Sequence, residues 1–578
     1  MRSSPLRYLG LLVVALLLAA CGTQPSPQPT AVQPTSAPSP TAEQAVEHTA
    51  TPEEPPASDG AGLPLPTDRD DLFAASGICA RCHTQLIDDA GSDVSMDTAW
   101  RSSMMANAAR DPYWKAAVRA EILSNPDYRA VIEDKCTTCH TPMARFSEAA
   151  AGGEGRLLDD GYLDPEHASH TLAMDGVSCT VCHQIQPDGL GEDDSFSGGY
   201  VISTELPPEQ RVAFGQFTIR MGMARAMQAA SGFIPLQGIH VEQAELCATC
   251  HTLYTPYLDA SGQIAGEFPE QVPYLEWQAS SFGQSLSCQG CHMPAAQGTV
   301  ILSSEGARQP RSPFYQHTFV GGNAYMLNVL RSFGDELAVT ASDAQFRDKE
   351  ARTLEQLQER TASVALEGLA VDASTLTAEV VVKTMTGHKF PTGFPVRRAW
   401  IHLTVQDASG AIVFQSGAVN GDGSISGNDN DEDPTSFEPH YLVIDGPEQV
   451  QIYESIMGDT EGQTTTTLLR AAGLLKDNRL LPAGFDKTAV EADIAVRGTA
   501  MDDEDFYGGT DTVRFVVPLD GAGGPFTVTA ELLYQSISFR WVDNLRQHDA
   551  PEPAHFLAYY EEVPNQPVVV ASTTEQVE

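Results

Sequence analysis

Asp175-Gly-Val-Ser-Cys-Thr-Val-Cys-His183 ends in Cys179-Thr-Val-Cys182-His183, one of five Cys-x-x-Cys-His motifs in the chain. The other four motifs begin at Cys79, Cys136, Cys247 and Cys288. The 578 residues include eleven cysteines; ten of them belong to these motifs, and Cys21 alone does not. Because no cysteine is left over between the motifs, the pattern indicates one chemical task repeated five times rather than a disulfide framework.

That task is the covalent attachment of c-type haem. Two thiols at this spacing add to the two vinyl groups of the porphyrin, and the adjoining histidine becomes an iron ligand. Zinc ribbons do not require a histidine after each cysteine pair, and thioredoxin-like pairs occur singly. The sequence therefore predicts five covalently bound haems c. The thioether cysteines are Cys79, Cys82, Cys136, Cys139, Cys179, Cys182, Cys247, Cys250, Cys288 and Cys291, and the iron ligands are His83, His140, His183, His251 and His292.

The ligand at the sixth iron position separates electron carriers from enzymes, because a bis-histidine iron is saturated and an open iron can bind a substrate. His170 and His240 each precede a motif closely, whereas His317 follows the last motif within an aromatic stretch. His388 lies in a turn bracketed by Gly and Pro, residues 386–393. We predict these four histidines as distal ligands, with His167 as the substitute for His170. His402, His440, His548 and His555 are predicted to have packing or surface roles.

Methionine is the other distal ligand to consider. Met104 and Met105 lie on a predicted helix, residues 97–109, that follows the first motif. Core filling is the other interpretation of such methionines. The first haem is thus predicted to be either histidine/methionine-ligated or open at its sixth position.

The N-terminus has the features of an export signal. Arg2 and Arg7 precede an apolar run that is too short to cross a membrane, and Leu18-Ala-Ala-Cys-Gly22 has the form of a bacterial lipobox. We predict a signal peptide over residues 1–20 and a lipid attached to Cys21, which would anchor the protein in a bilayer. Ordinary signal cleavage is the other interpretation. The chain is therefore predicted to be an exported lipoprotein at the outer face of the cytoplasmic membrane, in the periplasm or on the cell surface.

The fold class predicted from hydrophobic periodicity is a multidomain α+β protein. A disordered tether rich in Pro, Thr and Ser (residues 21–70) leads to a haem-packed domain of helices and loops (71–335), a helical connector (336–362) and a β-sandwich-like domain (363–578) with a polar insertion (419–499). Asp97 and Asp111 are predicted helix N-caps. Helices are predicted over 97–109, 112–124, 275–282 and 324–333, and strands over 376–384, 399–406, 411–415, 512–518, 526–533 and 568–571.

The formal net charge of −43 argues against nucleic-acid binding, which requires a basic surface. It is compatible with a solvated exported protein or with docking of a cationic partner. One acidic loop also carries oxygen donors of the kind that Ca²⁺ prefers, although a solvated loop is the other interpretation. These donors are Asn420, Asp422, Asn428, Asp429, Asn430, Asp431 and Asp433.

Residues 79–335 resemble the multihaem cytochromes c related to hydroxylamine oxidoreductase and its tetrahaem acceptor cytochrome. The similar pieces are Asp175 to His183, Glu245-Leu-Cys-Ala-Thr-Cys-His-Thr-Leu253 and Ser287-Cys-Gln-Gly-Cys-His-Met-Pro294. Residues 386–398 and 450–485 resemble uncharacterised bacterial multihaem proteins with a C-terminal β domain. The resemblance implies that His170, His240 and His317 are distal ligands, and it departs from the family at Met104 and Met105, where histidine would be usual.

The function predicted from these observations is electron transfer between a membrane oxidoreductase and a soluble or extracellular acceptor. The alternative is a multihaem oxidoreductase that converts a small nitrogen or sulfur compound at one open haem. Five haems match the number in ammonia-forming nitrite reductase, but that family replaces one motif histidine with lysine. All five motifs here end in histidine, which weakens the alternative.

Overall fold

The computed structural model describes residues 62–306 and 308–578. The predicted signal peptide, Cys21 and the tether up to residue 61 lie outside the described residues. All described residues belong to one unit, residues 55–578. No helix in this part of the chain is long and apolar enough to cross a membrane.

Each of the five motifs begins on a helix. One turn of helix brings the two cysteines of a motif onto the same face, because residues three apart are neighbours on a helix surface. The motif helices are α1 (Ser76–Ala80), α4 (Arg129–His140), α7 (Cys179–Cys182), α9 (Ala244–Ala248) and α11 (Cys288–His292). The other helices of this half are α2 (Met96–Arg101), α3 (Pro112–Ser124), α5 (Pro142–Ala150), α6 (His170–Met174), α8 (Met221–Ser231), α10 (Pro273–Gln278), α12 (Ala324–Ser332) and α13 (Asp343–Arg360).

Helix α3 has the predicted bounds, and its predicted N-cap is confirmed. The Asp111 carboxylate accepts hydrogen bonds from the backbone N–H groups of Tyr113 at 2.9 Å and Trp114 at 3.2 Å. Helix α12 is confirmed to within one residue. The predicted helical connector, residues 336–362, contains α13, which begins only at Asp343 and ends at Arg360. Of the predicted helix 275–282, only the first part is helical, since α10 ends at Gln278.

The predicted helix 97–109 is wrong beyond Arg101, and its N-cap is Ser95 rather than Asp97. After Arg101 the chain forms turns. The Ser103 hydroxyl accepts the N–H of Ala106 at 3.1 Å, and the Asn107 side chain donates to the Arg101 and Ser103 carbonyls. Such side-chain bonds to the local backbone compete with helix hydrogen bonds. The two candidate methionines, residues 104 and 105, therefore lie in turns.

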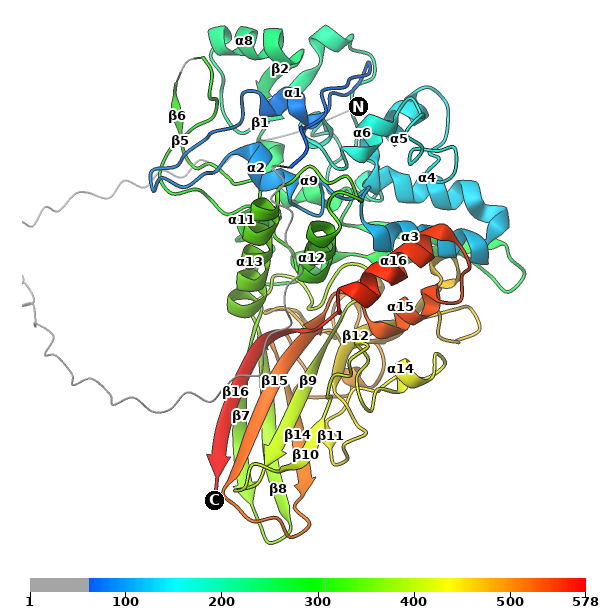
Figure 1. Cartoon of the computed structure of the whole chain (residues 1–578), viewed down its shortest axis with the longest axis vertical. Helices are drawn as coiled ribbons and strands as arrows, with labels where there is room; N and C mark the ends of the chain where they lie inside the picture. The colour runs from blue at the N-terminus through cyan, green and yellow to red at the C-terminus, as the bar shows by residue number, and fades with distance from the viewer. Residues whose placement is uncertain (1–61, 307) are drawn as a thin grey trace, which may run out of the picture. The chain divides into compact units, whose positions relative to one another are not determined.

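Three two-stranded sheets lie among these helices (Figure 1). One is parallel and two are antiparallel. The pairs are β1 (Val212–Gly215) with β2 (Ile234–Gln237), β3 (Leu253–Leu258) with β4 (Ile264–Gln271), and β5 (Val300–Ile301) with β6 (Pro310–Arg311). The periodicity of this half of the sequence had indicated helices and loops only.

The C-terminal half contains two facing sheets, as the alternating pattern predicts. One sheet has the order β13-β12-β9-β15-β16 with β10 on β9, and the other has the order β11-β14-β8-β7. Alternate residues of both sheets point into one buried core, for example Ile401 opposite Leu532 and Val380 opposite Val513. The strands are β7 (Ala362–Val371), β8 (Thr375–Thr384), β9 (Arg398–Gln406), β10 (Ile412–Ser416), β11 (Val443–Ile444), β12 (Ile452–Gly458), β13 (Gly473–Asp477), β14 (Thr510–Pro518), β15 (Phe526–Gln535) and β16 (Val568–Val577).

Two helices near the C-terminus, α15 (Phe539–Leu545) and α16 (Pro551–Glu562), were not predicted. Helix α16 packs against α3 of the N-terminal half (Figure 1). Arg119 and Glu552 form an ion pair at 2.8 Å, and the rings of Tyr113 and Phe556 meet at 5.2 Å. The end of the chain thus contributes to the half that carries the motifs.

Candidate haem-binding cavity

One cavity of about 1320 Å³ is bordered by all five motifs. The five motif histidines and nine of the ten motif cysteines line it, and Cys82 does not. The exposed surface of the His251 side chain faces this cavity, because protein surrounds the residue on its other sides. Residues from the C-terminal half, such as Arg397 and Tyr534, complete the wall.

Thiols of different motifs lie next to one another. Cys79 interacts with Cys179, Cys139 with Cys250, and Cys247 with Cys288, and none of the described cysteines forms a disulfide. The first motif therefore adjoins the third, whereas the fourth adjoins both the second and the fifth. The spatial order of the motifs differs from their order in the sequence.

Backbone carbonyls hold four of the motif histidines in one tautomer. A carbonyl can only accept a hydrogen bond, so Nδ1 of each ring carries the hydrogen and Nε2 keeps its lone pair for a metal ion. The bonds run from His83 to Leu302 at 2.7 Å, from His140 to Ala108 at 3.1 Å, from His183 to Phe214 at 2.5 Å and from His292 to Val320 at 2.6 Å.

Burial favours the neutral form of the imidazoles of His83, His140, His183 and His251, which is the form that binds metal. It lowers the pKa of His140 and of His251 to about 4, and it also lowers the pKa of His83 and His183. The ring of Trp114 stacks on His140 with ring centres 4.2 Å apart and planes 2° apart. This contact restricts the rotation of the His140 ring.

Two predicted distal histidines lie opposite motif histidines. The ring centres of His183 and His317 are 6.3 Å apart, and those of His292 and His388 are 6.2 Å apart. When two imidazoles bind one metal ion from opposite sides, each metal–nitrogen distance is about 2.0 Å, and each nitrogen lies about 1.1 Å from its ring centre. The two ring centres are then about 6.2 Å apart. Both spacings therefore fit one iron between each pair, and the residues of the cavity fit haem.

The two distal histidines are half-buried and border the cavity. Burial lowers the pKa of His317 to about 3 and also lowers the pKa of His388. Nδ1 of His388 donates to the Lys389 carbonyl at 2.9 Å, which leaves its Nε2 as the free nitrogen.

The other predicted distal ligands are placed differently. His170 and His240 do not border the cavity. Nδ1 of His170 bonds to the Tyr162 carbonyl at 2.8 Å, and Nε2 of His240 bonds to the Ile185 carbonyl at 2.9 Å. Their roles as ligands stay predictions.

Met104 and Met105 both border the cavity, so their assignment also stays a prediction. Met104 in addition packs against an apolar cluster that contains Tyr113 and Tyr325. His548, for which the sequence indicated only packing or surface roles, also borders the cavity. Its position depends on the unpredicted segment between α15 and α16.

A buried ionic network connects the His388 loop with α10. The Glu276 carboxylate accepts hydrogen bonds from the Lys389 N–H at 3.2 Å and the Thr392 hydroxyl at 2.6 Å. Arg479 pairs with Glu276 at 2.9 Å and with Asp477 at 2.8 Å, and the Lys389 ammonium pairs with Asp477 at 2.7 Å. Sequence reasoning missed this network, because its members lie in three separate segments.

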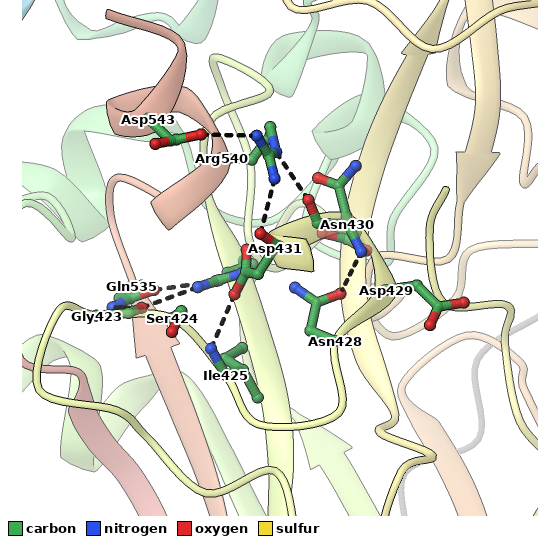
Figure 2. Close-up of polar contacts among 12 residues, drawn as sticks. Gly423, Ser424, Ile425, Asn428, Asp429, Asn430, Asp431, Gln535, Arg540 and Asp543 are labelled. Atoms are coloured by element: carbon green, nitrogen blue, oxygen red, sulfur yellow. Dashed lines mark hydrogen bonds and ion pairs between the residues drawn. The ribbon is translucent and has the colours of Figure 1, made fainter. Parts of the chain in front are cut away.

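The acidic loop with the predicted calcium donors folds onto two arginines (Figure 2). Both carboxylate oxygens of Asp431, in α14 (Asp429–Glu432), accept hydrogen bonds from Arg398 at 2.8 and 2.9 Å. Arg540 donates to the backbone carbonyls of Asn430 and Asp431 at 2.7 Å. The guanidinium groups therefore already donate hydrogen bonds to oxygens that a calcium ion would need as ligands. For this reason we do not propose a calcium site in this loop.

A second cluster of potential metal ligands lies in the sandwich, where His440 is buried beside Asp503 and Asp511. Nδ1 of His440 accepts hydrogen bonds from the amide groups of Gln451 at 2.7 Å and Asn478 at 3.1 Å. The oxygen of each amide accepts a backbone N–H, which fixes the amide orientations. Nε2 of His440 therefore carries the hydrogen, which it donates to Asp503 at 2.9 Å, and has no lone pair for a metal.

No protein-family model and no curated protein sequence match the chain. Among solved structures, the chain is similar to a penta-haem cytochrome c552 from Thermochromatium tepidum, with 16% identity and a TM-score of 0.48. The match covers 88% of this chain and 100% of the other. A likeness of this size does not establish a shared family, so the assignment has to come from the residues themselves.

Proposed function

We propose that this chain is a c-type cytochrome that carries five haems and transfers electrons. The observation that carries the proposal is the convergence of five Cys-x-x-Cys-His motifs on one cavity, with two motif histidines facing a second imidazole at the spacing that suits a shared iron. Neutral, oriented imidazoles on the cavity wall add to this support.

The arrangement of the motifs favours conduction. Haem, when bound, supplies a one-electron iron couple. The chain places the motifs in an unbroken series of neighbours, because the fourth adjoins both the second and the fifth and the first adjoins the third. Electrostatic coupling between Cys182 and Cys250 connects the third motif with the fourth. The protein holds the attachment sites at fixed separations.

We also propose that the protein acts outside the cytoplasmic membrane, anchored through a lipid on Cys21, and passes electrons from a membrane oxidoreductase to a soluble or extracellular acceptor. The support for this is the sequence of residues 1–22, together with the attachment of c-type haem outside the cytoplasm. Radiolabelled fatty acid should be incorporated into the wild-type chain and not into Cys21→Ala.

A second candidate function is an oxidoreductase of a small nitrogen or sulfur compound. The observation that favours it concerns His83, His140 and His251. Among the described residues, no ring contact places a second imidazole opposite any of the three. An iron with one protein ligand could bind a small molecule in its open position.

Two measurements on the purified, full-length protein test these proposals. The intact mass should exceed that of the polypeptide by five haems, and a chain without haem would refute the proposed function. Electron paramagnetic resonance of the oxidised protein should show only low-spin haem for a carrier. A high-spin signal that changes on addition of nitrite or cyanide would instead support the oxidoreductase.

A further inference from the structure

One segment of this acidic protein has no acidic residue. Asp and Glu account for 77 of the 578 residues, yet none occurs between Glu209 and Glu242. The same segment contains Arg211, Arg220 and Arg225 and no lysine. Its local charge is therefore opposite in sign to the net charge of −43.

The structure folds this segment into the parallel pair β1/β2 with α8 beside it, at the end of the unit away from the C-terminal strand (Figure 1). Its inner side belongs to the haem-binding cavity. The carbonyl of Phe214 in β1 accepts the hydrogen bond from His183, and Met227 and Leu236 border the cavity. This segment therefore forms the wall between solvent and the third motif.

The outer side of the segment exposes large apolar side chains. Met221 is 70% exposed and Ile239 68%, and neither borders the cavity.

Three arginines belong to this part of the structure. Arg220 directly precedes α8 and Arg225 lies within it, and both side chains are exposed. Arg311, from β6, lies over the ring of Phe217 at 5.2 Å and donates to the Thr218 carbonyl at 2.9 Å. We call the surface formed by Arg220, Met221, Arg225, Ile239 and Arg311 the arginine face.

We propose that the arginine face is the docking surface for a small acidic redox protein. This inference rests on the proposed function, since it names the partner and the point of electron exchange. Redox complexes are small and transient, and complementary charge steers the encounter. An acidic partner is repelled by most of this molecule and attracted at the arginine face, so it would arrive beside His183.

The observations favour a protein over a membrane surface. Helix α8 has only 11 residues, and its exposed apolar positions include the small residues Ala226, Ala229 and Ala230. Anionic membranes are recognised by denser clusters, of about four to eight Lys or Arg, and by large apolar anchors. The arginine face has three arginines among scattered apolar side chains.

The test uses the haem-loaded, full-length protein and a plant-type [2Fe–2S] ferredoxin, a small acidic redox protein, as the probe. The double variant Arg220→Glu/Arg225→Glu reverses two exposed charges. Among the described residues, neither side chain forms a hydrogen bond or ion pair that the substitution would break. Arg514→Glu, at an exposed position of β14, is the matched control. At low ionic strength, stopped-flow reduction by ferredoxin should be at least about tenfold slower in the double variant and less than about twofold slower in the control.

Three further results decide the proposal. For the wild-type protein, the rate with ferredoxin should fall as salt is added, because salt screens attraction. A rate that rises with salt, or equal slowing by Arg514→Glu, would show that the net charge governs the encounter and would overturn the proposal. Binding of the wild-type protein to phosphatidylserine vesicles that is lost in the double variant would overturn it in favour of a membrane surface.

Haem content separates this inference from the proposed function. Both variants should retain the optical spectrum of the wild-type protein and should be fully reduced by dithionite. A wild-type chain without haem would refute the proposed function, whereas a loaded protein without selective slowing would refute only the docking surface.

Discussion

His183 and His317 lie with their ring centres 6.3 Å apart and their planes 23° apart. His183 follows helix α7, whereas His317 comes from the loop between β6 and α12. Their separation is too long for stacked rings in contact and matches two ligands of one metal ion. His292 and His388 repeat the relationship at 6.2 Å, with one histidine from each half of the chain.

Replacing either distal histidine should open one iron without detaching its haem, because the thioether bonds and the motif histidine remain. His317→Ala and His388→Ala should each keep five haems by mass and convert one of them to the high-spin form in electron paramagnetic resonance. His402→Ala is the control, since His402 bonds to Glu531 on the sandwich surface. Unchanged spin states in both variants would show that neither histidine is a ligand.

Met104 and Met105 can be tested by absorption spectroscopy. If either thioether binds the first iron, the oxidised wild-type protein should show a weak long-wavelength histidine/methionine band. Met104→Ala/Met105→Ala should then lose this band, whereas Met293→Ala, next to the fifth motif, should keep it. A band that persists in the double variant would remove both residues as ligands.

Glu276 should stabilise the loop that carries His388. Glu276→Gln keeps the side-chain shape but removes the charge opposite Arg479, and losing a charged hydrogen bond in the interior costs about 1.5–3 kcal/mol. Urea unfolding, followed by haem absorbance, should show this loss. Glu355→Gln is the control, because Glu355 and Arg360 are half exposed and such pairs contribute less than about 1 kcal/mol. Equal stabilities of both variants would contradict the role of Glu276.

Acid should weaken the same network. Burial opposes ionisation of Asp477, but the charges of Arg479 and Lys389 outweigh it and lower the pKa of Asp477 to about 2. A carboxyl whose folded pKa is lowered from about 3.9 adds about 2–3 kcal/mol of stability above that pH, and the contribution disappears as the pH falls toward 2.

Asp477→Asn should therefore be destabilised by about 3–5 kcal/mol at pH 7, because Lys389 and Arg479 lose their shared counter-charge. The difference from the wild-type protein should shrink between pH 4 and pH 2, which urea unfolding at several pH values would measure. A constant difference across this range would contradict the lowered pKa.

The acidic loop should not depend on calcium. Because Arg398 and Arg540 already bond to its oxygens, neither EGTA nor added Ca²⁺ should shift the thermal midpoint of unfolding. Asp431→Asn should destabilise the protein by about 3–5 kcal/mol, since the buried Arg398 loses its counter-charge. A midpoint that rises with Ca²⁺ in the wild-type protein, and not in Asp431→Asn, would restore the calcium prediction.

The sequence by itself determined the five Cys-x-x-Cys-His motifs, because the fixed local spacing that the proposed reaction with two vinyl groups requires can be read from five residues. It also determined most of the sandwich strands, whose alternating pattern follows from one buried face. Helix α3 followed from its cap at Asp111 and the proline at its first position.

Only the tertiary structure decided which motifs are neighbours and which histidines face each other. Cys79 meets Cys179 and His292 meets His388 through contacts between distant segments, and local spacing contains no information about them. The same reason explains why the sequence did not reveal the partners of the acidic loop, since Arg398 and Arg540 lie in other elements. Ligand identity at a metal site is a property of three-dimensional packing, whereas the attachment motif is a property of the chain.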